Sequence, residues 1–145
     1  RRAEKKGEVN QIEVYDDYGH HPTEIAATLS SFKKAVKGRR LVVAFQPHRY
    51  SRTKECFYDF APALLHADTV VLTDVYSAGE MLDKEADGPS LFATLPSGGP
   101  HRYSAKETLI DDLEKLVKPG DVVVTLGAGD ITHVGPSLLH RLSSI

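Results

Sequence analysis

Runs of β-branched and apolar residues recur along the chain, with amphipathic segments between them. Residues 41–45 (LVVAF), 69–73 (TVVLT) and 121–126 (DVVVTL) are almost continuously apolar, which is typical of strands that are covered on both faces of a sheet. Residues 12–15 (IEVY) alternate between apolar and polar positions, as a half-buried strand does. A further, weaker strand is predicted near residues 101–104 (HRYS).

Helical spacing of apolar residues predicts the elements that connect these strands. The predicted helices lie at residues 23–36, 51–66, 104–120 and 131–142. The second contains Pro62, which is expected to kink or end it. The third is expected to open with a capping box formed by Ser104 and Glu107 and to stop at Pro119.

The order of these elements predicts an α/β fold, a three-layer Rossmann-like domain with a mostly parallel sheet and helices on both faces. The 145 residues have the length of one domain. Residues 1–10 are polar and are interpreted as a lead-in segment, and residues 77–100 as a long surface excursion with one helical turn at 90–95. The polar start without methionine predicts that residues 1–145 are a single domain cut from a larger multi-domain chain, and a native basic tail is the alternative.

Composition narrows the functional classes. A net charge of −2 gives no reason to expect a nucleic-acid partner, and no apolar run approaches the length of a membrane span. The single cysteine, Cys56, excludes an internal disulfide framework and is expected to serve packing. With no signal-peptide pattern, the sequence predicts a cytoplasmic location.

Most of the unusual polar chemistry follows the predicted strands. In a parallel sheet the loops that leave the carboxyl ends of the strands gather at one edge, where α/β proteins bind ligands. Those loops are residues 16–21 (DDYGHH), 46–52 (QPHRYSR), 74–80 (DVYSAGE) and 127–130 (GAGD). The sequence therefore predicts a binding site at this edge.

The first loop precedes a helix that is expected to begin near Pro22 or Thr23, because His21 before a proline stays extended. The free N–H groups of this helix start would suit an anion, and Asp16 and Asp17 could accept bonds from a ribose diol. A capped turn without a ligand is the alternative. A zinc site is disfavoured, since adjacent histidines point in different directions and no second ligand pair has suitable spacing.

The second loop places His48, Arg49 and Arg52 together after a buried strand. Two guanidinium groups would form a positively charged site for a carboxylate or a phosphate. Arginines paired with surface acids are the alternative. In the third loop, Asp74 and Glu80 could orient the arginines or face water. The glycines of residues 127–130 would let backbone approach a ligand closely.

The sequence contains no phosphate-binding G-x-x-x-x-G-K-[ST] loop. If the protein uses ATP, the residues that bind the triphosphate would have to lie on another part of the chain. Two functions fit the loops on their residues alone. They are a free-standing flavodoxin- or receiver-like binding module, and a small metal-dependent hydrolase that uses His and Asp.

Four motifs in this order, DDYGHHPTE, FQPHRYSRT, DVYSAGE and GAGDI, resemble the C-terminal domain of the Mur ligases over essentially the whole chain. Within that family, the resemblance is to the branch that joins L-alanine to UDP-N-acetylmuramate. The related murein peptide ligases, an alternative, share a similar first motif but differ where this chain has HRYSRT. The resemblance implies an ATP-driven amide ligation through an acyl phosphate, in peptidoglycan precursor synthesis.

The resemblance also implies roles for individual residues. Asp17 would lie near the ATP ribose, and the L-alanine site would be lined by Tyr18, His20 and His48. Arg49 and Arg52 would face the alanine carboxylate. His20 and His48 are expected to orient ligands rather than to transfer protons. ATP and Mg²⁺ would be held mainly by a central domain and the UDP-sugar by an N-terminal domain of the same chain, so the isolated domain is expected to be inactive.

Overall fold

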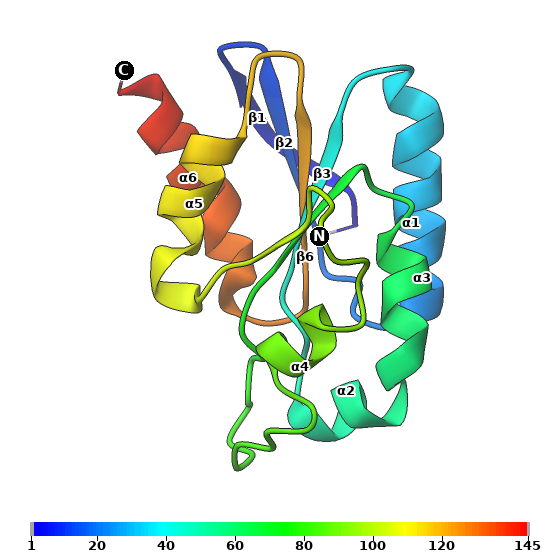
Figure 1. Cartoon of the computed structure of the whole chain (residues 1–145). Helices are drawn as coiled ribbons and strands as arrows, with labels where there is room; N and C mark the ends of the chain where they lie inside the picture. The colour runs from blue at the N-terminus through cyan, green and yellow to red at the C-terminus, as the bar shows by residue number, and fades with distance from the viewer. Residues whose placement is uncertain (1, 145) are drawn as a thin grey trace.

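The computed structural model describes residues 2–144, and within them six strands form one sheet in the order β1-β2-β6-β3-β4-β5 (Figure 1). Neighbouring strands run parallel, except that β1 and β2 pair antiparallel. The strands are β1 Glu4–Val9, β2 Ile12–Asp17, β3 Leu41–Phe45, β4 Thr69–Leu72, β5 Arg102–Tyr103 and β6 Val122–Leu126. The predicted α/β class with a mostly parallel sheet is confirmed.

Helices cover both faces of this sheet. The helices are α1 Pro22–Val36, α2 Tyr50–Glu55, α3 Phe60–Leu64, α4 Gly88–Phe92, α5 Leu109–Leu116 and α6 Val134–Ser143, with 3₁₀ turns at Phe57–Asp59, Lys106–Thr108 and Asp130–His133. In Figure 1 the sheet is seen edge-on, with α1 and α3 on one side and α5 and α6 on the other. The connections therefore build the three layers that the sequence predicts.

Side chains of the central strands alternate between two apolar cores. In β3, Leu41, Val43 and Phe45 enter the core beneath α1 and α3, whereas Val42 and Ala44 enter the core beneath α5 and α6. Both sets are fully buried. A continuous apolar run is thus what a strand covered on both faces requires.

The lead-in segment contains a strand that the sequence analysis did not assign. Residues 4–9 form β1, which pairs with β2 through a turn at Asn10 and Gln11, both at positive φ. Most side chains of β1 are exposed or half-buried, because it is an edge strand held mainly by backbone pairing. Its polar sequence therefore carries no apolar alternation.

The second predicted helix is not continuous. It breaks at Cys56, which ends α2, and resumes through a 3₁₀ turn as α3. Pro62 lies in the first turn of α3, where its missing N–H removes no helical hydrogen bond. The expectation that Pro62 kinks or ends the helix is therefore wrong.

The predicted capping box at Ser104 is also wrong. The backbone N–H of Ser104 donates to the Leu72 carbonyl at 2.9 Å, and its hydroxyl donates to Asp112 at 2.5 Å. Ser104 thus continues the sheet, and α5 begins only at Leu109, after a 3₁₀ turn.

Residues 77–100 are only partly a surface excursion. Met81 and Leu82 are largely exposed, but Ala86, Leu91 and Leu95 are buried, the leucines against the core of α1 and α3. The helical turn in this segment is α4, at 88–92 rather than 90–95.

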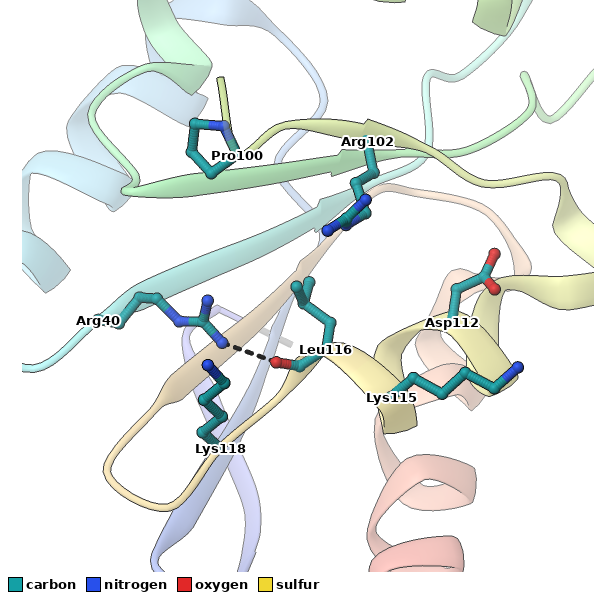
Figure 2. A pocket seen from close by; sticks show the side chains of 7 residues that line it. All are labelled: Arg40, Pro100, Arg102, Asp112, Lys115, Leu116 and Lys118. Carbon is teal, nitrogen blue, oxygen red and sulfur yellow. Dashed lines mark hydrogen bonds between the residues drawn. The ribbon is translucent and has the colours of Figure 1, made fainter. Parts of the chain in front are cut away.

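At the amino ends of the strands, side chains tie the connecting loops together. The Arg40 guanidinium donates to the Leu116 carbonyl at 2.8 Å and to Asp121 at 2.6 Å, which links β3, α5 and β6 (Figure 2). Among the described residues, no helix is long and apolar enough to cross a membrane.

Candidate functional site

Backbone hydrogen bonds join the four loops at the carboxyl ends of the strands, as the sequence predicts. Gly127 N–H donates to the Asp17 carbonyl at 3.1 Å. Tyr76 N–H donates to the Pro47 carbonyl at 2.8 Å, and Arg49 N–H donates to the Tyr76 carbonyl at 2.8 Å. These loops, together with α2, form the candidate site, at the lower end of the sheet in Figure 1.

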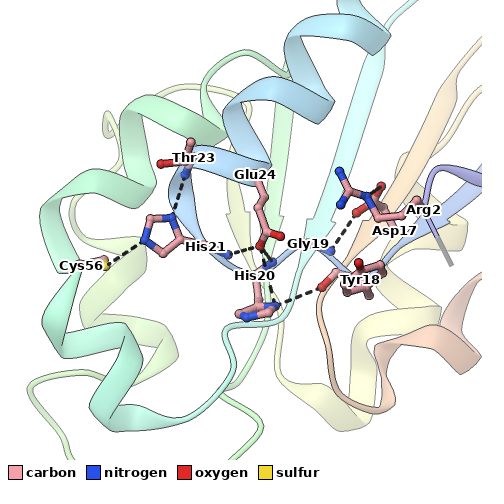
Figure 3. A network of polar contacts seen from close by, with 9 residues as sticks. All are labelled: Arg2, Asp17, Tyr18, Gly19, His20, His21, Thr23, Glu24 and Cys56. Carbon is pink, nitrogen blue, oxygen red and sulfur yellow. Dashed lines mark hydrogen bonds and ion pairs between the residues drawn. The ribbon is translucent and has the colours of Figure 1, made fainter.

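The first loop is built on the carboxylate of Asp17 (Figure 3). One oxygen accepts the Gly19 N–H at 2.8 Å and the other accepts the Ala3 N–H at 2.8 Å. A Cβ on Gly19 would lie 3.0 Å from the first oxygen, so a glycine fits here best. Asp17 is only 1% exposed, and its carboxylate shapes the turn that carries Tyr18 and His20.

The amide groups at the start of α1 already have acceptors within the chain. His21 is extended, at φ −92° and ψ 141°, and its Nδ1 accepts the Thr23 N–H at 3.1 Å. Glu24 accepts the N–H groups of His20 at 3.3 Å and His21 at 3.1 Å. The predicted helix start at Pro22 is confirmed, and the Thr23 N–H at this start is bonded within the chain.

Three aromatic rings from three loops lie next to one another. The His20 and His48 ring centroids are 5.8 Å apart, and the His48 and Tyr76 rings stack at 5.6 Å with an interplanar angle of 12°. Tyr76 was not among the site residues predicted from the sequence, although it lies in the third carboxyl-edge loop. His48 thus stands at the centre of the site.

The surroundings of His48 favour its neutral form. Burial lowers its pKa below 6.5, and the positive charges of His20, Arg52 and Arg49 lower the pKa further. Among the described residues, its buried Nδ1 atom has no hydrogen-bond partner. A neutral imidazole beside two cations can orient a ligand through a hydrogen bond without adding charge.

The arginine loop is fixed by backbone contacts. Arg49 has φ 68° and ψ 139°, an unusual conformation for a residue with a Cβ. Its carbonyl accepts both the N–H of Thr53 at 3.1 Å and the Thr53 hydroxyl at 2.8 Å. Thr53 is fully buried, so these two hydrogen bonds fix the start of α2.

The two acids that could orient these arginines or face water, Glu80 and Asp74, accept hydrogen bonds from other groups. Glu80 accepts from the Ser51 N–H at 3.0 Å and from the Ser51 hydroxyl at 2.5 Å. Asp74 accepts from the Tyr103 hydroxyl and, at 3.0 Å, from the Lys106 N–H. Within residues 2–144, neither Arg49 nor Arg52 has an acidic group at ion-pair distance.

The glycine loop packs against the chain itself. A Cβ on Gly129 would lie 2.6 Å from Tyr76 Cγ and 2.7 Å from Gln46 Oε1, and one on Gly127 would lie 2.9 Å from the Gln46 carbonyl oxygen. The glycines were expected to let the backbone approach a ligand. In the structure they let the backbone approach Gln46 and Tyr76.

Asp130 fixes the end of the same loop. It accepts from Gln46 Nε2 at 2.7 Å and pairs with Lys106 at 2.9 Å. Burial alone would raise the pKa of Asp130, but these two partners lower it below its ordinary value. Asp130 is therefore an ionised structural link between the loop and the 3₁₀ turn before α5.

The remaining predicted residues lie toward the N-terminal segment. The Arg2 guanidinium lies over the Tyr18 ring, 5.4 Å from its centroid, and 3.8 Å from Asp17 (Figure 3). Asp17, Arg2 and one face of α1 line a hollow of about 270 Å³. Asp16 is fully buried and accepts from the hydroxyls of Thr125 and Thr132, so it serves the sheet rather than the surface.

Cys56 and His21 lie next to each other beside the site, and neither of them was predicted from the sequence to have a binding role. Cys56 packs against the core beneath α1 and α3, as expected, and its Sγ lies 3.9 Å from His21 Nε2. Among residues 2–144, no group of three or more His, Cys, Asp or Glu side chains is gathered that could hold a metal ion.

A family model matches most of the chain. The model described as "Mur ligase, glutamate ligase domain" covers residues 1–129. Among curated proteins, the UDP-N-acetylmuramate–L-alanine ligase of Geotalea uraniireducens is 52% identical over an alignment of 145 positions, which covers 98% of this chain and 31% of that protein. The chain thus spans about a third of the length of the curated relatives that it matches.

Solved structures give the same picture. The UDP-N-acetylmuramate–alanine ligase of Thermotoga maritima is 32% identical with a TM-score of 0.77, over 99% of this chain and 30% of that one. A murein peptide ligase from Psychrobacter arcticus is 26% identical with a TM-score of 0.77, over 100% of this chain and 30% of that one.

Proposed function

The chain belongs to the Mur ligase, glutamate ligase domain family, and we propose that it is the C-terminal domain of an ATP-dependent ligase that joins L-alanine to UDP-N-acetylmuramate. In this reaction the sugar carboxylate takes the γ-phosphate of ATP to form an acyl phosphate. The alanine amine then attacks the carbonyl carbon, and phosphate leaves as the amide forms. The 52% identity to a ligase with this name supports the assignment.

The observation that carries the proposal is the pair of arginines beside a neutral histidine. Arg49 and Arg52 have no acidic partner among the described residues, and both lie close enough to lower the pKa of His48. A small amino acid offers one carboxylate, which two guanidinium groups bind through charge-assisted hydrogen bonds. Arg49 and Arg52 therefore hold the alanine carboxylate.

The aromatic residues complete the amino-acid site. His48 lies between His20 and Tyr76, and we assign its ring to orienting the bound amino acid. His20 is positioned by the Tyr18 carbonyl, 3.3 Å from its Nδ1. Tyr18 and His20 face the bound amino acid. None of these residues needs to transfer a proton, because placing the amine against the acyl phosphate is itself a large part of catalysis.

Asp17 marks the nucleotide side of the site. Its carboxylate borders the hollow of about 270 Å³ beside Arg2, and we assign contact with the ATP ribose to this position. ATP and Mg²⁺ are held mainly by a central domain. The UDP-sugar is held by an N-terminal domain. The present domain closes over both, and alone it has no ligase activity.

The proposal is tested with a chimera. This chain replaces the matching 31% of the Geotalea uraniireducens ligase, and phosphate release is measured with ATP, UDP-N-acetylmuramate and L-alanine. We expect alanine-dependent turnover, and none from the 145-residue chain alone. A folded chimera that ignores alanine but uses the murein tripeptide would reassign the chain to the murein peptide ligases. Turnover by the isolated chain would overturn the proposal altogether.

A further inference from the structure

A second concave surface lies at the opposite edge of the sheet, at the amino ends of the strands. It is a hollow of about 420 Å³ between α5 and the edge strand β5. Arg40, Arg102 and Lys118 surround it, and Leu116 and Pro100 supply apolar surface (Figure 2). None of these residues belongs to the candidate site described above.

The positive charge of this hollow is not neutralised by the chain. Arg40 is paired with Asp121. Arg102, Lys115 and Lys118 have no acidic group at ion-pair distance among residues 2–144, whereas Lys33 pairs with Asp68. The one acid that lines the hollow, Asp112, accepts instead from the hydroxyls of Ser104 at 2.5 Å and Thr108 at 3.3 Å.

Figure 2 shows how these cations are directed. The guanidinium of Arg102 and the ammonium of Lys118 both face the hollow, with the Leu116 side chain between them, while Lys115 points away from it. Gathering like charges is unfavourable unless an anion is held between them. On a chain with a net charge of −2, such a cluster is a local feature and not part of a general positive surface.

We propose that this hollow binds a small phosphate-bearing anion. The phosphate lies between Arg102 and Lys118, because a guanidinium fork and a neighbouring ammonium suit phosphate oxygens. The rest of the ligand rests on Leu116 and Pro100. The volume of about 420 Å³ is in the range of small-molecule pockets. The proposal does not depend on the ligase assignment.

The test uses amide NMR of the 145-residue chain titrated with sodium pyrophosphate at low salt. We expect saturable shifts at Arg102, Leu116 and Lys118, which weaken as salt is added. Arg102→Gln and Lys118→Gln should each reduce affinity by about tenfold, as expected for the loss of one charge-assisted contact. Lys118→Arg, which keeps the charge, should largely retain binding.

Two further variants separate this site from other positive charges. Lys34→Gln removes an exposed charge on α1 and should leave the affinity unchanged, and Arg52→Gln should leave the shifts at Lys118 in place. The inference is overturned if no saturation occurs by about 10 mM, a weak-binding limit. It is also overturned if Lys34→Gln weakens binding as much as Lys118→Gln, or if the shifts lie only in the arginine loop and disappear in Arg52→Gln.

Discussion

Arg49 is the residue at which backbone conformation and proposed function conflict most openly. Its φ of 68° lies in a region that only glycine adopts comfortably, yet its guanidinium is assigned to the alanine carboxylate. Backbone strain of this kind is common at functional sites and persists because the surroundings hold it in place. Here Thr53 and Tyr76 supply the hydrogen bonds that hold it.

A pair of variants separates the strain from the charge. Arg49→Gly and Arg49→Ala both remove the guanidinium, but only glycine relieves the positive φ. We expect Arg49→Gly to unfold with a free energy about 1 kcal/mol higher than Arg49→Ala, measured by urea denaturation. Both should lose alanine binding in the chimera. Equal stability of the two variants would show that the Arg49 backbone is not strained.

His48 shows how burial and nearby cations prepare a polar side chain for binding. Its pKa is lowered first by burial and then by His20, Arg52 and Arg49. The unfolded chain therefore binds a proton at higher pH than the folded chain does. The neutral-His48 contribution to stability is present above the ordinary value of 6.5 and is lost as the pH falls toward the lowered pKa.

This order of pKa values predicts an NMR titration. We expect the ring C–H signals of His48, assigned by their loss in His48→Gln, to titrate with a midpoint below 6.5. The destabilisation of the wild type between pH 7 and pH 5 should be smaller in His48→Gln, because the substituted side chain does not titrate. A midpoint at or above 6.5 would contradict the neutral, buried state.

At the scale of elements, the site depends on loops that pack tightly against one another. Gly129 brings the loop after β6 against Tyr76 and Gln46, at distances that leave no room for a Cβ. Tyr76 in turn stacks on His48. The glycine loop therefore supports the aromatic part of the site from behind.

Substitution of Gly129 tests this support. Gly129→Ala should lower the free energy of unfolding by about 1–3 kcal/mol, the usual cost of overpacking, and should shift the NMR signals of Tyr76 and His48. Gly99→Ala is a matched control, because its Cβ would meet its nearest neighbour, His101, at an ordinary 3.6 Å. If both variants were equally stable, Gly129 would not be a packing constraint.

The strands that the sequence predicts are those in which buried positions are occupied by apolar side chains. The continuous apolar runs of β3, β4 and β6 reflect their two covered faces. β1 could not be predicted in this way, since its hydrogen bonds to β2 involve backbone groups that every residue carries. The break at Cys56, between α2 and the 3₁₀ turn that precedes α3, was not predicted either.

The site could be predicted as far as position in the sheet determines it. His48, Arg49 and Arg52 follow a buried strand, and the parallel topology alone brings their loop to those of His20 and Tyr76. What the side chains do there could not be read from the sequence. Asp16 bonds to Thr125 and Thr132, and Glu80 to Ser51, through contacts between residues far apart along the chain.

At the scale of the whole molecule, the two edges of one sheet carry different groups of unpaired cations. The carboxyl edge presents Arg49 and Arg52 beside three stacked or neighbouring rings. The amino edge presents Arg102 and Lys118 around a separate hollow. The two apolar cores lie between these edges, so a substitution at one edge should leave the other intact.

The chain spans 31% of the length of its Geotalea uraniireducens relative, and its proposed share of the reaction is to present the amino acid. The effect of a site substitution should therefore fall on one substrate. The groups that bind ATP and the UDP-sugar are assigned mainly to other domains, so their apparent affinities should change little.

The KM for L-alanine of the chimera carrying Arg52→Gln tests this account most directly. Loss of one charge-assisted contact to the carboxylate should cost about 1.5–3 kcal/mol, and so raise the KM by about ten- to a hundredfold. The KM for ATP should stay unchanged, as should both values in the Lys34→Gln control. A folded Arg52→Gln chimera with an unaltered KM for L-alanine would contradict the claim that this arginine loop binds the amino acid.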